Sequence, residues 1–202
     1  MNPILLTAAG NPQNQDRGLI LHDGARVVLC VADGAGGLSG GAEAAILAVD
    51  MVRQNASLLV NADACAELMR SIDAAVSKDS IPGETTCALA VLTSEEIFGA
   101  SVGDSGIWIV PEIGDHLNLT QAQQRQPFIG SGNAWPIPFQ HATTAGSLLL
   151  ATDGLLKYTS AERILAVCRE HSVDIAGQRL IDLVRYSSGA FPDDVTLILA
   201  RI

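Results

Sequence analysis

The sequence predicts an α+β fold in which two sheets built from hairpins pack together and are covered by pairs of helices. Three observations lead to this class. Apolar runs of strand length occur in clusters, helical patterns occur two in succession, and regular strand–helix–strand alternation is missing. Such alternation would favour a parallel sheet, whereas clustered strands followed by paired helices favour an α+β arrangement.

The length, composition and charge of the chain limit the number of domains and the kinds of partner that we expect. The chain has 202 residues, of which 48% are hydrophobic, and it contains no linker or low-complexity segment, so we expect a single domain over residues 1–202. The net charge of −10 argues against nucleic acid and anionic membranes as partners. No apolar run approaches the roughly 20 residues that span a bilayer, and the N-terminus lacks the features of a signal peptide.

The cysteines predict a reducing environment. Four cysteines lie far apart, without the spacing of a zinc site. Cys30, Cys87 and Cys168 stand among apolar residues and are expected to be buried free thiols. Free thiols fit the cytosol, so the predicted location is cytoplasmic.

The first elements are strands. Residues 3–8 form a candidate strand, and a polar loop then leads to Asp16. The apolar runs 18–22 and 26–32 are separated by Asp23-Gly24, which is a strong hairpin signal. Asp16 is either an ordinary turn carboxylate or a second acidic group aimed at the end of this hairpin.

The stretch from Val27 to Gly41 organises the chain. Its apolar run is continuous and therefore predicts a strand buried on both faces, ending at Asp33. Gly34, Gly36 and Gly37 allow a tight turn that brings a carbonyl close to a bound ion. The turn lacks the lysine of a phosphate-binding P-loop, and from this stretch alone a metal site and a solvated turn are equally favoured.

Two helices are expected next. Residues 42–57 follow a helical pattern that places Ala45, Ile46, Val49 and Val52 on one face. Asn61 is a candidate N-cap for a helix over 62–77, which Pro82-Gly83 would end. The inward residues of this second helix are predicted to be Cys65, Leu68, Met69 and Ile72.

Strands return in the second half. Three runs follow at 85–93, 96–102 and 105–110, with Asp104 in the turn before the last. Residues 111–146 show little periodicity and are expected to be irregular, which in a compact domain is often functional. The run 147–152 is another buried strand, and it ends in Asp153-Gly154 as the earlier strand ends in Asp33-Gly34.

The chain is predicted to close with two helices and a strand. Thr159 and Glu162 form a candidate capping box for a helix over 160–170. A second helix is expected over 173–187, and Asp193 precedes a last strand over 195–202. The apolar residues of that second helix are Ile175, Leu180, Leu183 and Val184.

The loop carboxylates suggest metal chemistry. Asp33, Asp153 and Asp193 each stand at a strand end, and Asp16 and Asp104 lie in adjoining turns. If the sheets bring these ends together, the cluster cannot stay ionised without cations. Oxygen ligands favour Mg²⁺ or Mn²⁺, and two such ions bind a phosphate ester and activate water for in-line attack.

Five motifs in order resemble those of the protein phosphatase 2C (PPM) family of metal-dependent serine/threonine protein phosphatases, over nearly the whole chain. The motifs are Asn14-Gln-Asp16, Ala32-Asp-Gly-Ala-Gly-Gly37, Gly103-Asp-Ser105, Ala151-Thr-Asp-Gly-Leu155 and Asp193-Asp-Val-Thr196.

The resemblance implies a four-layer αββα sandwich with two Mn²⁺ or Mg²⁺ ions between the sheets and a phosphorylated protein as substrate. A metal-bound hydroxide would attack phosphorus, and no side chain would be the nucleophile. By the family pattern Asp33 would bridge both ions, the Gly34 carbonyl would ligate one, and Asp153 and Asp193 would complete the other site. Asp16 would be a central ligand, directly or through water, and Asp104 would help to hold a weaker third ion.

Several positions depart from the family pattern. Gln15 replaces a frequent glutamate, Asn11 stands where some members have a phosphate-binding arginine, and Gly106 replaces another frequent arginine. Lys157 occupies a position that is often acidic and puts the third ion in doubt; it either contacts substrate phosphate or is solvated. The segment between Asp104 and Asp153 is short for a full flap. The alternative function is a catalytically weak regulatory or binding module.

Overall fold

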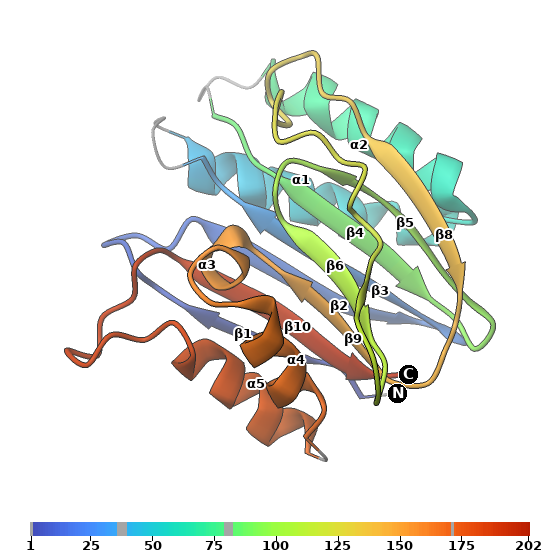
Figure 1. Ribbon diagram of the computed structural model, residues 1–202. Helices are drawn as coiled ribbons and strands as arrows, with labels where there is room; N and C mark the ends of the chain where they lie inside the picture. The colour runs from blue at the N-terminus through green and yellow to red at the C-terminus, as the bar shows by residue number, and fades with distance from the viewer. Residues whose placement is uncertain (1, 36–39, 79–82, 171) are drawn as a thin grey trace.

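Two five-stranded antiparallel sheets lie face to face, and helices cover the outer face of each (Figure 1). This arrangement is seen in a computed structural model that describes residues 2–35, 40–78, 83–170 and 172–202. The α+β class and the four-layer αββα order predicted above are confirmed.

The strands are distributed between the sheets as follows. The first sheet has the order β1 (Ile4–Ala8), β10 (Val195–Arg201), β9 (Ser147–Ala151), β6 (Gly106–Val110) and β7 (Leu117–Asn118). The second has the order β2 (Asp16–Asp23), β3 (Arg26–Asp33), β4 (Cys87–Leu92), β5 (Glu96–Val102) and β8 (Ile137–Ala142). The helices are α1 (Gly41–Gln54), η1 (Ala56–Leu58), α2 (Ala62–Val76), α3 (Asp153–Leu156), α4 (Ala161–Cys168) and α5 (Val173–Asp182).

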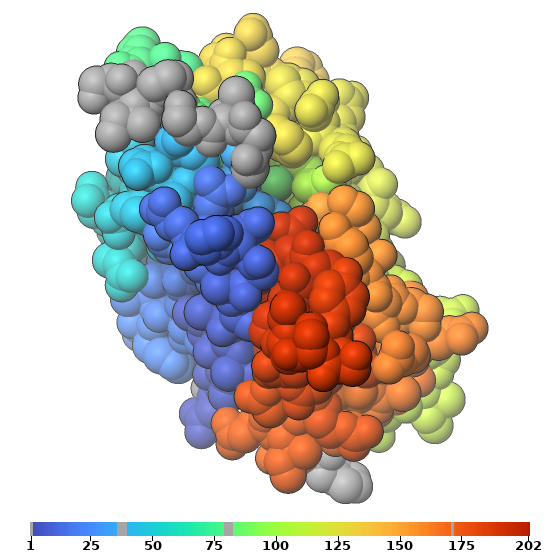
Figure 2. Space-filling view, turned by 90° about the vertical axis from the view of Figure 1, so that its left-hand side faces the viewer, coloured from blue at the N-terminus to red at the C-terminus, as the bar shows by residue number. Residues whose placement is uncertain are grey.

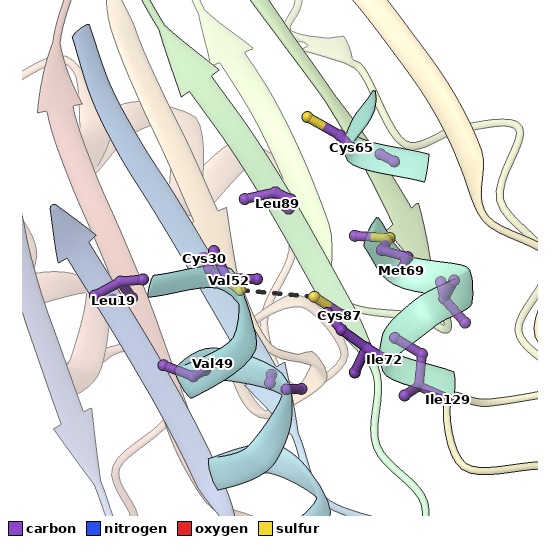
Figure 3. Close-up of a cluster of buried hydrophobic side chains, with 14 of the residues drawn as sticks. Leu19, Cys30, Val49, Val52, Cys65, Met69, Ile72, Cys87, Leu89 and Ile129 are labelled. Atoms are coloured by element: carbon purple, nitrogen blue, oxygen red, sulfur yellow. Dashed lines mark hydrogen bonds between the residues drawn. The ribbon is translucent and has the colours of Figure 1, made fainter. Parts of the chain in front are cut away.

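Three hydrophobic cores separate the four layers. One lies between α1, α2 and the second sheet (Figure 3), one between α4, α5 and the first sheet, and one between the sheets. Strand β3 is buried on both faces, as its continuous apolar run predicts. Val28 and Cys30 face the helices, whereas Leu29 and Val31 face the other sheet.

The buried face of α1 differs from the prediction. Ala45, Val49 and Val52 are buried as expected, but Ile46 is 41% exposed. The rest of the buried face is made of small residues, including Ala44 and Ala48, which let the helix approach the sheet closely.

Helix α2 begins as its sequence indicates. The side chain of Asn61 accepts a hydrogen bond from the backbone N–H of Ala64 and caps the first turn. The inward residues are buried as predicted, except Leu68, which is only partly buried. Cys65, Met69 and Ile72 are fully buried.

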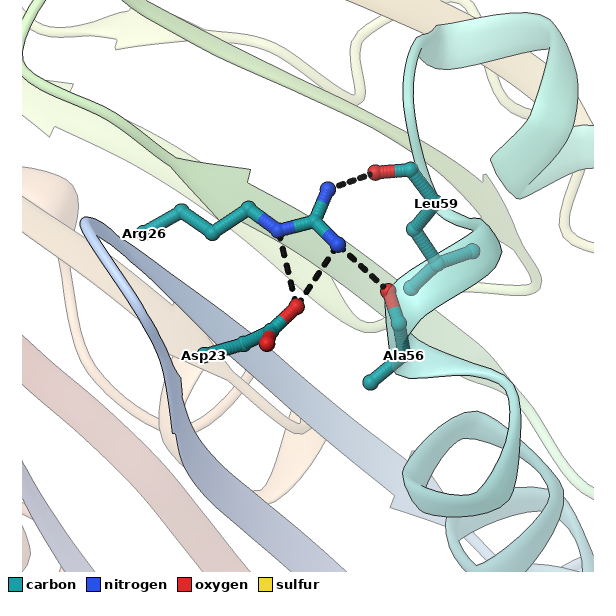
Figure 4. Close-up of polar contacts among 4 residues, drawn as sticks. All are labelled: Asp23, Arg26, Ala56 and Leu59. Atoms are coloured by element: carbon teal, nitrogen blue, oxygen red, sulfur yellow. Dashed lines mark hydrogen bonds and ion pairs between the residues drawn. The ribbon is translucent and has the colours of Figure 1, made fainter.

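Arg26 ties the predicted hairpin to the junction of α1 and α2 (Figure 4). The pairing of Asp23 with Arg26 across the turn confirms the hairpin, and Gly24 adopts a φ of +64° in it. The guanidinium of Arg26 donates to both Asp23 and the carbonyls of Ala56 and Leu59. The Ala56 carbonyl also accepts from the backbone N–H of Leu59, so Arg26 is its second donor, while Arg26 supplies a charged donor to the Leu59 carbonyl at the end of η1.

The helices of the C-terminal part are shorter than expected. The predicted capping box at Thr159 is wrong: Ser160 precedes α4, makes no side-chain cap, and the Thr159 hydroxyl is buried without a partner among the described residues. The next helix, α5, does have a side-chain cap: the Ser172 hydroxyl oxygen accepts from the backbone N–H of Ile175. Leu180 is buried as predicted, but Ile175 is 58% exposed.

The segment 111–146 contains a strand that the sequence analysis did not predict. Strand β8 pairs with β5 at the edge of the second sheet, and its residues alternate between half-buried and exposed. Pro138 interrupts the pattern in sequence, but an edge strand tolerates proline because one side of its backbone has no strand to pair with.

Some expectations fall outside the described residues. These are the turn glycines Gly36 and Gly37 and the proline of the Pro82-Gly83 helix stop. In the part of the chain that the structure describes, no helix has both the length and the apolar character required to cross a membrane.

Candidate metal centre

The predicted carboxylates gather at one end of the sandwich. Asp33 ends β3, Asp153 follows β9 and begins α3, and Asp193 lies two residues before the last strand. These three side chains and Asp104 line one cavity of ≈ 320 Å³. Asp16 is paired with Asp33 across the β2–β3 hairpin and lies buried beside this cavity.

Asp16 joins the two sheets. It begins β2 of the second sheet, yet its Oδ2 accepts a hydrogen bond of 2.8 Å from the hydroxyl of Thr152, which follows β9 of the first sheet. Only 3% of Asp16 is exposed. Its other oxygen, Oδ1, is buried without a hydrogen-bond partner among the described residues, and such an atom is costly unless a ligand, ion or water satisfies it.

The backbone of Asp33 is fixed by two threonines. Its N–H donates to Thr86 Oγ1 at 3.0 Å, and its carbonyl accepts from Thr86 N at 2.8 Å and Thr85 Oγ1 at 2.9 Å. Gly34 follows in a close contact, because a Cβ built on it would lie 2.4 Å from the carbonyl oxygen of Gly41. Only glycine fits there, which supports the prediction that the turn is tight.

Burial and mutual repulsion raise the pKa of these carboxyl groups. Burial is the main cause that raises the pKa of Asp33 to about 10, and the charges of Asp16, Asp153, Asp193 and Asp104 add to it in that order. Burial, with a contribution from Asp194, raises the pKa of Asp16 to about 7. Without cations, the cluster therefore favours protonated carboxyl groups.

The pKa of Asp153 is affected by the same causes. Burial and then the charges of Asp104 and Asp193 raise its pKa, while Lys157 opposes the change. The Nζ of Lys157 lies 3.8 Å from Asp153 Oδ2, one helical turn away. Gly154 is required next to it, because a Cβ at this position would lie 1.9 Å from the carbonyl oxygen of Asp194.

Asp194 has a structural role that the sequence analysis missed. It is 4% exposed, and its carboxylate accepts three backbone N–H bonds, at 2.8 Å from Gly10, 3.0 Å from Asn11 and 2.8 Å from Gln15. These bonds hold the loop before β2 against the loop before β10, and the two segments lie side by side on the surface in Figure 2. The only signal in the sequence was the doubled aspartate.

Asp193 lines the cavity together with Asp194. Its Oδ1 accepts from the Asn11 side chain at 3.2 Å and from Asp194 N at 3.0 Å. The amide of Asn11 therefore contacts a carboxylate of the cluster from the position where an arginine was expected by family resemblance.

On the far side of the cavity, Asp104 is paired with Arg125. The Arg125 Nε lies 2.8 Å from Asp104 Oδ2, and Phe128 from the same segment also lines the cavity. A second missed carboxylate, Asp73 of α2, holds this segment by accepting hydrogen bonds from three of its backbone N–H groups. A helix-interior aspartate gives no sequence signal for such a role.

The donor set fits hard divalent cations. It consists of carboxylate oxygens and a nearby backbone carbonyl, which are the ligands of Mg²⁺ and Mn²⁺. In the described part of the chain, no three His, Cys, Asp or Glu side chains are close enough to enclose an ion by themselves. The unpartnered Asp16 Oδ1 and the raised pKa values nevertheless mark a site that lacks positive charge.

Solved structures share this fold. A bacterial serine phosphatase is 20% identical with a TM-score of 0.88, the match covering 100% of this chain and 98% of that one. Stp1 of Staphylococcus aureus is 19% identical with a TM-score of 0.81, covering 99% and 94%. The catalytic domain of the serine/threonine phosphatase PstP, in complex with two manganese ions, is 21% identical with a TM-score of 0.82, covering 99% and 97%.

No curated protein matches the sequence significantly. The family model described as protein phosphatase 2C, however, matches residues 8–173. That range includes four of the five clustered carboxylates, Asp193 lying beyond it. On this match, the chain belongs to the protein phosphatase 2C family.

Proposed function

We propose that this chain is a Mn²⁺- or Mg²⁺-dependent phosphatase that hydrolyses phosphoserine and phosphothreonine esters of a partner protein. The observation that carries the proposal is the convergence of five carboxyl groups at one cavity in a protein phosphatase 2C chain. Burial, and after it the repulsion from neighbouring carboxylates, raises the pKa of Asp33 to about 10, and divalent cations that bind there would relieve this repulsion.

The proposed ligands are those that the family resemblance implies, and the carboxylates that line or adjoin the cavity support this choice. When bound, the cations supply Lewis-acid activation of the phosphate ester and of the attacking water. By the family resemblance Asp33 would help to hold both ions; it is paired with Asp16 across the β2–β3 hairpin and lines the cavity together with Asp153. The proposed ligand set for two ions is Asp16, Asp33, Asp153, Asp193 and the Gly34 carbonyl, with Asp104 at a third, weaker site.

The surrounding residues hold these oxygens in place. Thr152 fixes one oxygen of Asp16, and the other oxygen is buried without a partner among the described residues and so is free to accept a ligand. Thr86 holds both backbone groups of Asp33, and its hydroxyl is hydrogen bonded to that of Ser105 at 2.7 Å. Ser105 is therefore engaged in positioning, and it has no adjacent base that would make it a nucleophile.

Hydrolysis of p-nitrophenyl phosphate by the purified protein tests the proposal. We expect turnover that depends on Mn²⁺ or Mg²⁺, disappears with a chelator, and falls more than about 100-fold in Asp33→Asn, since even residues that only orient metal ligands are worth 10- to 100-fold. Asp182→Asn is the matched control, because this exposed aspartate of α5 contacts Arg185 and Gln178 on its own surface and does not line the cavity. Wild-type protein without metal-stimulated turnover would contradict the proposal.

A phosphatase-like binding module is the second candidate. It is favoured by two observations: Lys157 lies near Asp153, and Arg125 pairs with Asp104, so two carboxylates already have cationic partners. Calorimetric titration with Mn²⁺ separates the candidates, since the enzyme requires two ions whereas one or none would favour the module.

The partner and location are inferred from chemistry. A phosphorylated protein, such as the target of a serine/threonine kinase, is the proposed substrate, and nucleic acid and membrane are not expected to bind a chain with a net charge of −10. Cys30, Cys65, Cys87 and Cys168 are all buried free thiols, which supports a reducing cytoplasm.

A further inference from the structure

Two cationic side chains stand among the carboxylates of the cavity. Among its described lining residues, Arg125 and Lys157 carry the positive charges, while Asn11 and Gln15 are neutral. A phosphate monoester that enters this cavity brings further negative charge. Its approach therefore depends on positive charge at the cavity rim as well as on bound metal.

Arg125 is available for exchange with a ligand. Its side chain is 70% exposed, and its Nε lies 2.8 Å from Asp104 Oδ2. In the described part of the chain, Nη1 and Nη2 make no hydrogen bond. An exposed ion pair of this kind is worth only about 0–1 kcal/mol, whereas the guanidinium fork matches phosphate oxygens in a bidentate manner. Replacement of Asp104 by phosphate therefore costs little.

The segment that carries Arg125 is held on both sides. Before it, the side chain of Gln123 donates to the Ser105 carbonyl at 2.8 Å. After it, Ile129 is fully buried and its backbone is bonded to Thr85, the same residue that binds the Asp33 carbonyl. Arg125 is therefore placed beside the cavity by contacts that do not involve its own charge.

Lys157 offers a different kind of contact. It lies one turn after Asp153 at a distance of 3.8 Å, too long for a hydrogen bond, and half of its side chain is exposed. A lysine ammonium is a compact point charge without the planar fork of arginine. Its contribution to phosphate binding is therefore expected to be smaller and less dependent on orientation.

We propose that Arg125 is the residue that binds the phosphoryl group of the substrate, exchanging its bond to Asp104 for bonds to phosphate oxygens, with Lys157 as a second, weaker cation. This inference rests on the proposed phosphatase function. It assigns recognition of the phosphoryl group to the segment between β7 and β8, whereas Asn11 at the start of the chain carries no charge for this purpose.

The test compares Arg125→Ala, Arg125→Lys and Lys157→Ala with wild type at saturating Mn²⁺. The measurements are kcat and KM for p-nitrophenyl phosphate, the inhibition constant of inorganic phosphate, and Mn²⁺ affinity by calorimetry. Arg70→Ala is the matched control, because Arg70 forms an exposed ion pair of the same 2.8 Å length with Glu67 on α2. It removes the same charge away from the cavity.

We expect Arg125→Ala to raise both KM and the phosphate inhibition constant roughly 10- to 100-fold, the effect of losing charged hydrogen bonds, while kcat falls much less and Mn²⁺ affinity is kept. Arg125→Lys should recover only part of this loss, and Lys157→Ala should cause a change of a few fold. Arg70→Ala should match wild type.

Three results would overturn the assignment. They are a KM and inhibition constant for Arg125→Ala within twofold of wild type, full rescue by lysine, or a loss of Mn²⁺ affinity that accounts for the change in KM. If wild-type protein shows no metal-dependent hydrolysis, the proposed function fails separately. Calorimetric binding of inorganic phosphate to the Mn²⁺-loaded proteins then still decides the role of Arg125.

Discussion

Replacing Asp73 should weaken the attachment of residues 130–134, which follow the cavity-lining Phe128, to helix α2. This aspartate is 5% exposed, and its Oδ1 accepts from the backbone N–H groups of Gly130 at 2.7 Å and Gly132 at 3.0 Å, while Oδ2 accepts from Ala134 N at 3.1 Å. Each hydrogen bond to a charged group is worth about 1.5–3 kcal/mol. The three share one carboxylate and do not add fully, so we expect Asp73→Ala to cost about 3–4 kcal/mol.

Asp73→Asn provides a graded comparison. Its amide oxygen can replace Oδ1 and keep the bonds to Gly130 and Gly132, whereas its NH₂ group cannot accept from Ala134. We expect it to cost about 1–2 kcal/mol, with the loss of one of the charged bonds. In a chain of this size each kcal/mol lowers Tm by about 2–4 °C.

Urea unfolding followed by circular dichroism, with thermal melts in parallel, measures these costs. Glu67→Ala on the same helix is the control, because this side chain is 72% exposed and only pairs with Arg70. If Asp73→Ala costs less than about 1 kcal/mol, or if the Asn and Ala variants are equally destabilised, the hydrogen bonds are not what holds the segment.

Three further predictions concern the cavity and the hairpin. Asp33→Asn should raise the Tm of the metal-free protein, because it removes a carboxylate whose charged form is disfavoured by burial, and it should abolish stabilisation by Mn²⁺ in the same melts. With chelator present, the free energy of unfolding of the wild type should fall as pH rises from 5 to 8. The folded-state pKa values of Asp16 (about 7) and Asp33 (about 10) lie above the unfolded value of 3.8, so the folded protein holds more protons than the unfolded chain in this range. A stability that does not change with pH would contradict this. That pH-dependent fall should be smaller in Asp33→Asn. Arg26→Ala should cost about 1.5–3 kcal/mol in urea unfolding, because it removes the charged donor to the Leu59 carbonyl and a second donor to the Ala56 carbonyl. Arg53→Ala, whose exposed ion pair is 4.0 Å long, should change stability by less than about 0.5 kcal/mol.

Periodicity explains which elements were predictable. The continuous apolar run of β3 predicts burial on both faces, and the strand indeed lies between two cores. The same reasoning failed for Ile46 of α1, because pattern analysis favours bulky apolar residues, while the packed face of that helix is dominated by alanines. It also failed for β8, where Pro138 suppressed the strand pattern and nothing local revealed that the strand would lie at a sheet edge.

Carboxylates at strand ends were visible in sequence because each follows or precedes an apolar run. Asp73 has no such signal, and Asp194 directly precedes an apolar run without any sign of its structural role, although both are more deeply buried than Asp153 or Asp104. Their role is to accept backbone N–H bonds from loops that are distant in the chain. Such a role depends on tertiary contacts alone, so no spacing rule identifies it.

The position of Asp16 explains why the candidate centre cannot exist apart from the packed sandwich. Asp16 and Asp33 belong to the second sheet, whereas Asp153 and Asp193 adjoin strands of the first. The hydrogen bond from Thr152 to Asp16 joins the two groups, and it forms only when the sheets are packed so that the end of β9 lies against the start of β2. Repulsion among these carboxylates opposes the packing of the two sheets, whereas burial of the apolar core between the sheets favours it. Bound cations would relieve the repulsion among the carboxylates, so metal binding and sheet packing should stabilise each other.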